Sequence, residues 1–441
     1  IQKYSYFSNK KAADIIEKTQ KAFLQYKNFN ISQKSQAILE IAQKLEQNKE
    51  QYSQLISLEM GKIPAESISE IEKCIDLCKY YAKNGPKFLN DEYIDKNQKQ
   101  FITYQPLGLV FAIMPWNFPF WQVFRFAIPA LIAGNGCILK HADNVSGCSL
   151  ALERIFSNNN LPENIFRSLL IKPGQVNQII ANKYIKATSF TGSTKIGKKI
   201  AQQSAKYLKK TVLELGGSDP YIILKDANIK KAAKLCAKSR LMNAGQSCVA
   251  AKRFIAVKEI YQEFLKHLIS EMEKFQIGNN SGSKFNIAPQ SSKKLRDNLH
   301  KQVKKSIKMG GKCLMGGKIP KIPGYFYPPT IIENPKKGSP AYNEELFGPV
   351  ATIIKAHDEK EAIKIANDSE FGLGSAIFSS DIKKATNIAK HNIESGICFI
   401  NDLVKSSPEA PFGGIKNSGY GRELSYFGIK EFTNIKYINV Q

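Results

Sequence analysis

The sequence predicts an α/β protein, with a dinucleotide-binding type of domain followed by a second α/β domain. Its 441 residues exceed what one ordinary core holds and indicate two or three domains. From residue 101 onward, strand-like apolar runs alternate with helical patterns, which produces a parallel sheet covered by helices on both faces. Hydrophobic residues make up 43% of the chain, a share that favours a globular protein over a disordered one.

The expected elements begin with a helical N-terminal part, followed by alternating strands and helices. Residues 9–80 are expected to be helical because apolar residues recur at i, i+3 and i+4. Residues 101–119 are rich in β-forming side chains and end in the proline-bracketed loop PWNFP. The alternation continues with a helix, a glycine turn and a strand over 127–140. Further helices are expected at 148–159, 174–183 and 193–210. Further strands are expected at 166–171, 185–192 and 210–217.

A second α/β stretch begins after about residue 216. It contains strand patterns at 252–257, 351–356 and 374–380 and a long helical pattern at 261–275, and the tail 431–440 alternates like an edge strand. The longest apolar run, 125–140, is interrupted by glycine and proline and is shorter than a membrane span. No signal peptide and no membrane partner are therefore expected.

Cysteine, histidine and charge patterns narrow the class of protein further. The eight cysteines lack the spacing of a disulfide scaffold, which favours a reducing cytoplasm, and the five histidines lack metal-ligand spacing, so no metal is expected. The net charge is +26, which could attract nucleic acid. However, the lysines are dispersed without an arginine-rich tail. We interpret them as a solvated surface and expect no nucleic-acid partner.

One strand-to-helix turn is a candidate phosphate site. In SFTGSTKIGKK, the strand meets the helix through Gly192, Ser193 and Gly197, where free N–H groups and the positive helix end favour an anion. The spacing differs from the usual G-x-G-x-x-G, and an ordinary strand–helix turn explains it equally well.

Three further stretches carry side chains suited to acyl chemistry. Asn117 in PWNFP lies in a rigid loop that suits a pre-aimed oxyanion donor, although a simple turn is the alternative. Glu214 in LELGG ends a buried strand, where desolvation raises a carboxyl pKa towards that of a general base; the alternative is a pair with a lysine. Cys248 follows the polar loop NAGQS and is a candidate nucleophile with a lowered pKa facing a cleft. Cys137, Cys236 and Cys398 are interpreted as buried filler.

Taken together and in this order, the motifs resemble the aldehyde dehydrogenase superfamily, most closely its prokaryotic succinate-semialdehyde dehydrogenase branch. The resemblance runs from about residue 10 to the C-terminus and is carried by MPWNFPFWQVFRFAIPALIAGN, LKHADN, SFTGSTKIG, VLELGGSDPYIIL, NAGQSCVAAKRFI, EELFGPVATI, ANDSEFGL and PFGGIKNSGYGRELSYFGIKEF. It implies a Rossmann-like NAD-binding domain (1–92 and 106–216), a catalytic domain (217–426) and a small β oligomerisation arm (93–105 and 427–441) of a homodimer or homotetramer.

The resemblance also implies the catalytic roles. Cys248 would form a thiohemiacetal with the aldehyde, while Asn117 and the Cys248 backbone N–H hold the oxyanion. After hydride transfer to the nicotinamide, Glu214 would activate the water that hydrolyses the thioester. The resemblance favours hydrolysis of the thioester over transfer of the acyl group to CoA, because Glu214 is a glutamate and the CoA-acylating relatives typically lack one there.

Cofactor and substrate residues follow from the same resemblance. NAD is preferred over NADP, which remains possible, because a carboxylate at Asp143 repels a 2′-phosphate although Lys140 could attract it. Arg125 would bind a carboxylate of the substrate; the alternative is that Arg125 is a helix-surface or interface residue. Some family members have a second arginine where this chain has Met242. Ser406 and Ser407 would therefore share the binding of the carboxylate. The remaining cofactor residues implied are Trp116, Gly192, Ser193, Glu345 and Phe347.

The expected reaction is NAD(P)-dependent oxidation of succinate semialdehyde to succinate. The alternative within the same mechanism is oxidation of another small or aliphatic aldehyde. A basic binding protein on a dehydrogenase scaffold is the alternative from another class. It is disfavoured because the set Asn117, Glu214 and Cys248 is intact.

Overall fold

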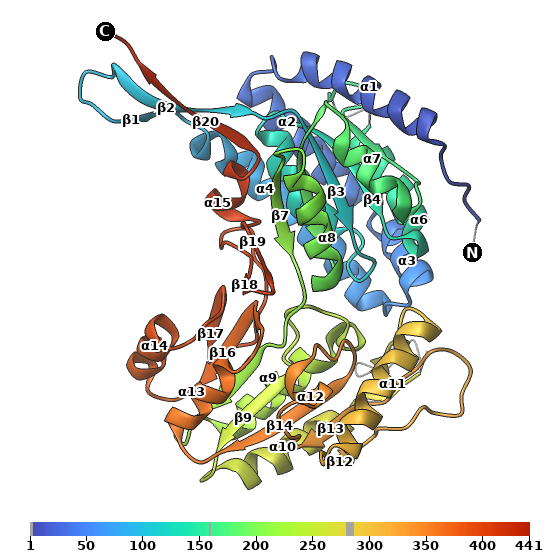
Figure 1. The fold of residues 1–441 in the computed structure, drawn as a ribbon, viewed down its shortest axis with the longest axis vertical. Coiled ribbons are helices and arrows are strands. Elements are labelled where there is room, and N and C mark those ends of the chain that lie inside the picture. The colour runs from blue at the N-terminus through green and yellow to red at the C-terminus, as the bar shows by residue number, and fades with distance from the viewer. Residues whose placement is uncertain (1–2, 158–159, 279–285) are drawn as a thin grey trace.

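The protein has two α/β lobes and a projecting β arm, as the computed structural model in Figure 1 shows. The structure describes residues 3–157, 160–278 and 286–441. Each lobe has its own large core of buried apolar side chains. The α/β fold class expected from the alternation of strands and helices is confirmed.

Four helices form the N-terminal part, as their periodicity predicts. They are α1 (Asn9–Tyr26), α2 (Ile31–Gln47), α3 (Lys49–Met60) and α4 (Pro64–Phe88). Asn30 and Gln33 form a capping box at the start of α2, and Pro64 occupies the first turn of α4, where its missing N–H is tolerated. Helix α4 packs along α2, α3 and α5 (Trp121–Ile132), so one face of it reaches the first lobe's interior.

The first lobe contains a six-stranded sheet in the order β19-β7-β6-β3-β4-β5. The strands are β3 (Leu109–Met114), β4 (Gly136–His141), β5 (Phe166–Ser168), β6 (Ile185–Thr191), β7 (Lys210–Glu214) and β19 (Gly419–Tyr420), of which only β19 is antiparallel to its neighbour. The helices α6 (Ser146–Phe156), α7 (Val176–Ala181) and α8 (Thr194–Ala205) connect them. The helix expected over 148–159 thus ends at Phe156, and positions 158–159 lie outside the described residues.

This sheet has a switch point between β3 and β6. The chain proceeds from β3 outward through β4 and β5, then returns to place β6 and β7 on the other side of β3. Loops at the carboxyl ends of the two strands diverge at such a point and leave a crevice for a ligand. The loop after β3 is PWNFP and the turn after β6 carries Gly192 and Ser193.

The second lobe contains a seven-stranded sheet in the order β12-β13-β14-β9-β8-β16-β17, parallel except for β12. Its strands are β8 (Pro220–Ile223), β9 (Arg253–Val257), β12 (Lys312–Met315), β13 (Thr330–Glu333), β14 (Val350–Ala356), β16 (Gly374–Phe378) and β17 (Ile397–Ile400). Its helices are α9 (Ile229–Leu241), α10 (Tyr261–Glu273), α11 (Lys293–Lys308), α12 (Pro340–Asn343), α13 (Glu359–Asn367) and α14 (Ile382–His391). Short pairs β10 (Gln276–Ile277) with β11 (Asn286–Ile287) and β15 (Phe371–Gly372) with β18 (Ile415–Lys416) complete the strands.

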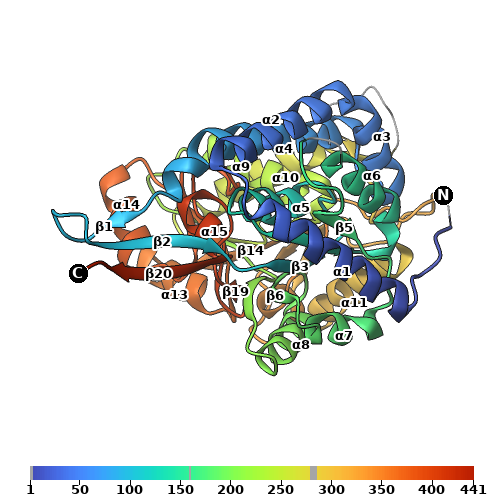
Figure 2. The ribbon, with the colours of Figure 1, turned by 90° about the horizontal axis from the view of Figure 1, so that it is seen from above.

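The arm is a three-stranded antiparallel sheet that extends away from the first lobe (Figure 2). Its strands are β1 (Glu92–Tyr93), β2 (Gln100–Pro106) and β20 (Thr433–Asn439), and α15 (Ser425–Lys430) precedes β20. Strands β2 and β20 pair in register over their whole length, from Gln100 with Asn439 to Pro106 with Thr433. The division into two domains and an arm by residue number stays a prediction. Its ranges include positions 1–2, 158–159 and 279–285, which the structure does not describe.

None of the helices in the described part of the chain is both long and apolar enough to cross a bilayer.

Candidate active site

Cys248 lies at the boundary between two cavities. One, of about 260 Å³, is lined by the loops after β3, β6 and β7, at the switch point of the first sheet. The other, of about 190 Å³, lies between α4, α5 and the loop that follows β17. Cys248 and Gln122 line both cavities. A thiol in this position can meet one ligand from each side, so Cys248 faces a cleft rather than filling a core.

The loop before Cys248 has an unusual backbone. Asn243, Ala244 and Gly245 all have positive φ angles, of 53°, 51° and 73°. A side chain on Gly245 would place Cβ 2.2 Å from the carbonyl carbon of Gly348, so only glycine fits there. Non-glycine residues in the left-handed region are uncommon and cluster at functional sites. The left-handed turn sets the course of the chain immediately before the nucleophile.

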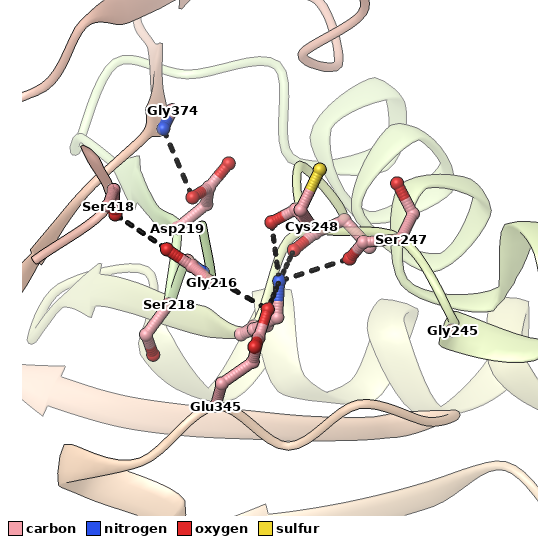
Figure 3. Close-up of polar contacts among 12 residues, drawn as sticks. Gly216, Ser218, Asp219, Gly245, Ser247, Cys248, Glu345, Gly374 and Ser418 are labelled. Carbon is pink, nitrogen blue, oxygen red and sulfur yellow. Dashed lines mark hydrogen bonds and ion pairs between the residues drawn. The ribbon is translucent and has the colours of Figure 1, made fainter. Parts of the chain in front are cut away.

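A buried ammonium group holds the loop from the other side. Lys252 Nζ donates hydrogen bonds to the carbonyl oxygens of Ser247 (3.2 Å), Cys248 (2.7 Å) and Ala250 (3.1 Å), and lies 3.7 Å from Glu345 Oε1 (Figure 3). Because three carbonyls converge on one cation, the backbone around the thiol is fixed. Lys252 follows Cys248 by four residues in the motif NAGQSCVAAK, but nothing in the pattern indicated its role.

The pKa of Cys248 differs from the sequence-based expectation. We expected a lowered value, but burial raises the pKa of this thiol to about 12, against the opposing effect of Arg125 and Lys252. The short polar neighbours of the loop suggested exposure, whereas the chain folds the loop between the two lobes. The free thiol is therefore protonated at neutral pH, and its reaction requires a proton acceptor.

Asn117 is placed to donate a hydrogen bond towards the first cavity, which it lines. Its Nδ2 donates a hydrogen bond to the backbone carbonyl oxygen of Gln246 at 3.0 Å. Asn243 Nδ2 donates to the backbone carbonyl oxygen of Asn117 at 2.9 Å. A carbonyl oxygen only accepts hydrogen bonds, so the contact with Gln246 shows that the Asn117 side chain turns its nitrogen, not its oxygen, towards Gln246. The second N–H of Nδ2 remains for an oxyanion.

Glu214 ends β7 and is 2% exposed, and neither of its carboxyl oxygens has a hydrogen-bond partner among the described residues. Burial, and then the nearby Glu423, raise the pKa of Glu214 well above its usual value. This direction agrees with the expectation from the sequence. Arg125 contacts Glu423 at 2.7 Å, so its guanidinium stabilises the charged form of Glu423 by direct contact and that of Glu214 from farther away.

The cavity at the switch point has features that suit a nicotinamide dinucleotide. Trp116 and Phe347 form an edge-to-face pair with centroids 6.0 Å apart, and the carboxylate of Glu345 lies on the same wall. A side chain at Gly192 would meet the Phe190 ring at 2.6 Å, so the backbone stays open there. Ser193 caps α8 without a side-chain hydrogen bond, which leaves the first N–H groups of the helix for an anion. These residues fit the cofactor that the resemblance implies.

Gly197 does not lie in this cavity. It is buried within α8, and a Cβ at this position would come within 2.4 Å of Leu215 Cδ2. The missing side chain lets α8 approach the end of β7, and the expected contact of Gly197 with the cofactor stays a prediction.

Lys140 lies near the carboxyl end of β4, the next strand of the sheet, and Asp143 follows that strand. Lys140 Nζ contacts Asp143 Oδ1 at 3.3 Å, and the Tyr6 hydroxyl donates to Asp143 Oδ2 at 3.1 Å. Asp143 lines a separate hollow of about 100 Å³ together with Tyr6 and His141. The N-terminal segment thus borders the hollow on which the cofactor argument depends, a contact that the sequence did not suggest.

The second cavity holds two of the three residues expected to bind substrate. Arg125 and Ser406 line it, together with apolar side chains such as Trp121 and Phe412. Ser407 is not among the lining residues, and its hydroxyl instead donates to Glu409 at 2.5 Å. The expected contact of Ser407 with the substrate is corrected accordingly, because its side chain turns to the exposed surface.

Comparison with known proteins gives the family. Residues 1–438 match the family described as Aldehyde dehydrogenase family. The chain belongs to this family. A probable succinate-semialdehyde dehydrogenase (NADP(+)) of Synechocystis sp. is 41% identical to this aldehyde dehydrogenase over 424 residues, which cover 96% of this chain and 93% of that protein. The succinate semialdehyde dehydrogenase (NAD(P)+) Sad of Escherichia coli is 40% identical over 417 residues, which cover 94% and 90%.

Solved structures agree with the family. The crystal structure of succinic semialdehyde dehydrogenase from Streptococcus pyogenes in complex with NADP+ superimposes with a TM-score of 0.97. It is 35% identical in sequence, and the match covers 100% of this chain and 97% of that one. The aldehyde dehydrogenase fold expected from the motifs is therefore confirmed, and so is the resemblance to the succinate-semialdehyde dehydrogenase branch.

Within residues 3–157, 160–278 and 286–441, no group of three or more His, Cys, Asp or Glu could hold a metal ion. Three side chains of this region were not singled out from the sequence: Lys252, Glu423 and Lys73, of which the last lines the second cavity. The first two stand within motifs that were noted for other residues. Lys73 lies on a helix whose pattern indicated only packing.

Proposed function

We propose that this aldehyde dehydrogenase oxidises succinate semialdehyde to succinate with a nicotinamide dinucleotide. The observation that carries the proposal is the position of Cys248 between a cavity suited to the cofactor and a cavity with cationic side chains on its wall. The names of the relatives from Synechocystis sp. and Escherichia coli support the choice of substrate.

In the proposed reaction, the thiol of Cys248 releases its proton to solvent water, and the resulting thiolate adds to the aldehyde carbon. The free N–H of Asn117 and the Cys248 backbone N–H stabilise the oxyanion that forms. A nicotinamide dinucleotide held in the cavity lined by Trp116, Glu345 and Phe347 would supply the hydride acceptor that oxidation of this adduct to a thioester requires. Glu214 then takes a proton from water, the hydroxide adds to the thioester carbon, and the carbon–sulfur bond breaks to release the carboxylic acid and the thiolate.

For the cofactor, we propose a preference for NAD over NADP. The support is the carboxylate of Asp143, which contacts Lys140 at 3.3 Å and so offsets a cation that would attract a 2′-phosphate. The alternative is a preference for NADP, the cofactor in the name of the Synechocystis sp. relative. If this chain shared that preference, it would favour NADP in spite of Asp143.

The arm supports the proposal of a homodimer or homotetramer, and the eight free cysteines support the proposal of a reducing cytoplasm. Strand β20 exposes apolar side chains on its outer face, with Ile435 60% and Tyr437 54% exposed. A long apolar strand at a sheet edge is an association site. Light scattering of the purified protein tests this, and a monomer at micromolar concentration would overturn it.

Steady-state kinetics test the proposed function. The substrates are succinate semialdehyde, glutarate semialdehyde and butanal, each with NAD and with NADP. The proposal predicts the highest kcat/KM for succinate semialdehyde with NAD. A higher kcat/KM for butanal would favour the alternative, oxidation of a small uncharged aldehyde, for which the apolar side chains Trp121 and Phe412 in the same cavity speak.

A further inference from the structure

His141 joins the end of strand β4 to the loop that carries Asn117. It is the last residue of β4 and is 4% exposed, and its ring lies against the loop PWNFP that follows the neighbouring strand β3. Its Nε2 lies 2.8 Å from the carbonyl oxygen of Pro119, and its Nδ1 lies 3.2 Å from that of Met114. Met114 precedes the loop and Pro119 ends it, so one imidazole lies against both ends of this segment.

The contacts of the ring assign its proton to Nε2. The backbone N–H of Ala142 donates to Nδ1 at 2.9 Å, so Nδ1 carries a lone pair rather than a hydrogen. The Met114 oxygen is then a neighbour of Nδ1 and not a hydrogen-bond partner, whereas Nε2–H donates to the Pro119 carbonyl oxygen. Burial lowers the pKa of His141 to about 4, so the ring is neutral and keeps this arrangement at pH 7.

The loop held by His141 presents two side chains to the proposed site. Trp116 and Asn117 line the cavity suited to the cofactor, as Cys248 does. An oxyanion donor works because it is aimed before the reaction begins. A displacement of about 1 Å can therefore cost about 100-fold in rate. The backbone of the loop sets where the Asn117 amide points, so whatever holds this backbone affects the reaction.

A second contact holds the chain just after the loop. Glu70 of α4 accepts hydrogen bonds from the backbone N–H groups of Phe120 and Trp121, at 2.8 and 3.0 Å. These contacts fix the start of α5 and use N–H groups only. The carbonyl oxygen that ends the loop, that of Pro119, accepts from His141 instead. His141 thus ties the loop to the sheet of the first lobe.

The backbone of His141 also contacts a residue proposed to bind the cofactor. Lys140 Nζ donates to the carbonyl oxygen of His141 at 3.1 Å and contacts Asp143 at 3.3 Å. The main chain of His141 therefore supports the adenosine side of the proposed cofactor site, while its side chain supports the loop with the oxyanion donor.

We propose that His141 is a positioning residue of this aldehyde dehydrogenase: its Nε2–H holds the Pro119 carbonyl so that the Asn117 amide faces the oxyanion. This inference rests on the proposed function, since His141 acts through the donor assigned to Asn117. The oxyanion forms on the reacting carbon of every aldehyde. The role of His141 is therefore the same for charged and uncharged substrates.

Three variants separate the two ring nitrogens. His141→Gln retains an N–H near the place of Nε2, His141→Asn retains an acceptor near Nδ1 but is too short to reach Pro119, and His141→Leu removes both. We expect the rate of reduced nicotinamide formation in the first turnover to fall by about 10- to 100-fold in His141→Leu and His141→Asn. His141→Gln should stay within about threefold of the wild type. Stopped-flow absorbance with succinate semialdehyde and with butanal measures this rate, and both aldehydes should show the same loss.

A double-mutant cycle with Asn117→Ala separates positioning from a general structural role. If His141 acts through Asn117, His141→Leu slows the wild type by the factor above but slows Asn117→Ala by less than about twofold. His300→Leu is the matched control, because His300 also has a side-chain partner, the Tyr327 hydroxyl at 3.2 Å, and lines neither cavity. This control should keep the wild-type rate.

The inference is overturned if His141→Asn and His141→Leu keep the wild-type rate, or if His141→Gln loses as much as His141→Leu. It is also overturned if His141→Leu costs the same factor with and without the Asn117 side chain. Should His141→Leu not fold, His141→Asn takes its place in each comparison. If Asn117→Ala itself keeps the wild-type rate, the oxyanion donor of the proposed function is wrong and the inference falls with it, whereas a loss in Asn117→Ala alone overturns only the inference.

Discussion

The Nε of Arg125 lies 2.7 Å from Oε2 of Glu423, and both side chains are 2% exposed. This contact joins α5 to the segment that precedes α15, beside the nucleophile and the carboxyl group of Glu214. One guanidinium thus serves two carboxyl groups, Glu423 by contact and Glu214 at longer range. The pair therefore affects the stability of the fold and the protonation of Glu214, and not only the binding of the substrate.

Arg125→Met should destabilise the fold, because it leaves Glu423 buried without its counter-charge. The loss of one partner of a buried ion pair costs about 3–5 kcal/mol. Denaturant unfolding followed by circular dichroism measures it, with Lys79→Met as a control that changes nothing. The double variant Arg125→Met with Glu423→Leu should regain much of the loss. Equal stability of Arg125→Met and wild type would contradict the buried pair.

The pH dependence of kcat/KM with butanal should report the raised pKa values of Cys248 and Glu214. Both groups act in their deprotonated forms; burial raises the pKa of Cys248 to about 12 and that of Glu214 well above the usual carboxyl value. The rate should therefore rise continuously between about pH 6 and pH 9. Stopped-flow measurement under first-order conditions provides the profile. A rate independent of pH over this range would show that the reactive groups are already ionised.

Glu214→Gln should stop the enzyme at the thioester. The amide cannot accept a proton from water, so hydrolysis slows by about 100- to 10,000-fold while Cys248 still reacts. Mass spectrometry of the digested variant should find the acyl group on the peptide that contains Cys248. Glu263→Gln, an exposed glutamate of α10, is the control and should accumulate no acyl group. Full turnover by Glu214→Gln would rule out its role as general base.

Asp143→Ser should shift the cofactor preference towards NADP. Removal of the carboxylate eliminates its repulsion of a 2′-phosphate and frees Lys140, which it contacts at 3.3 Å. We expect the ratio of kcat/KM for NADP to that for NAD to rise by about tenfold, equal to about 1.4 kcal/mol. Tyr6→Phe removes a hydrogen bond to Asp143 but keeps its charge, and should change the ratio little. An unchanged ratio in Asp143→Ser would show that another group sets the preference.

The sequence predicts the positions of the strand ends well, and with them much of the site. Asn117 follows β3 and Glu214 ends β7 because strand and helix periods alternate clearly there, and parallel strands bring their carboxyl ends to one edge. The motif NAGQSC identified Cys248, since small polar residues before a cysteine are atypical of a helix core.

What the sequence could not predict depends on contacts between distant segments. Arg125 and Glu423 meet only after the chain returns from the second lobe to the first sheet. Lys73 lies on a helix whose amphipathic pattern is satisfied by packing alone, so its place in a cavity had no local signal. Gly197 fitted a phosphate-turn pattern, but the close approach of α8 to Leu215 requires glycine for packing.

Turnover of succinate semialdehyde by Cys248→Ala tests most directly whether this sulfur is the nucleophile. Cys313→Ala, a partly buried cysteine of β12 remote from both cavities, is measured beside it. We predict that Cys313→Ala keeps the wild-type rate and that Cys248→Ala retains no measurable rate, although it folds normally. If Cys248→Ala oxidised the aldehyde as fast as the wild type, the mechanism built on Cys248 would be wrong.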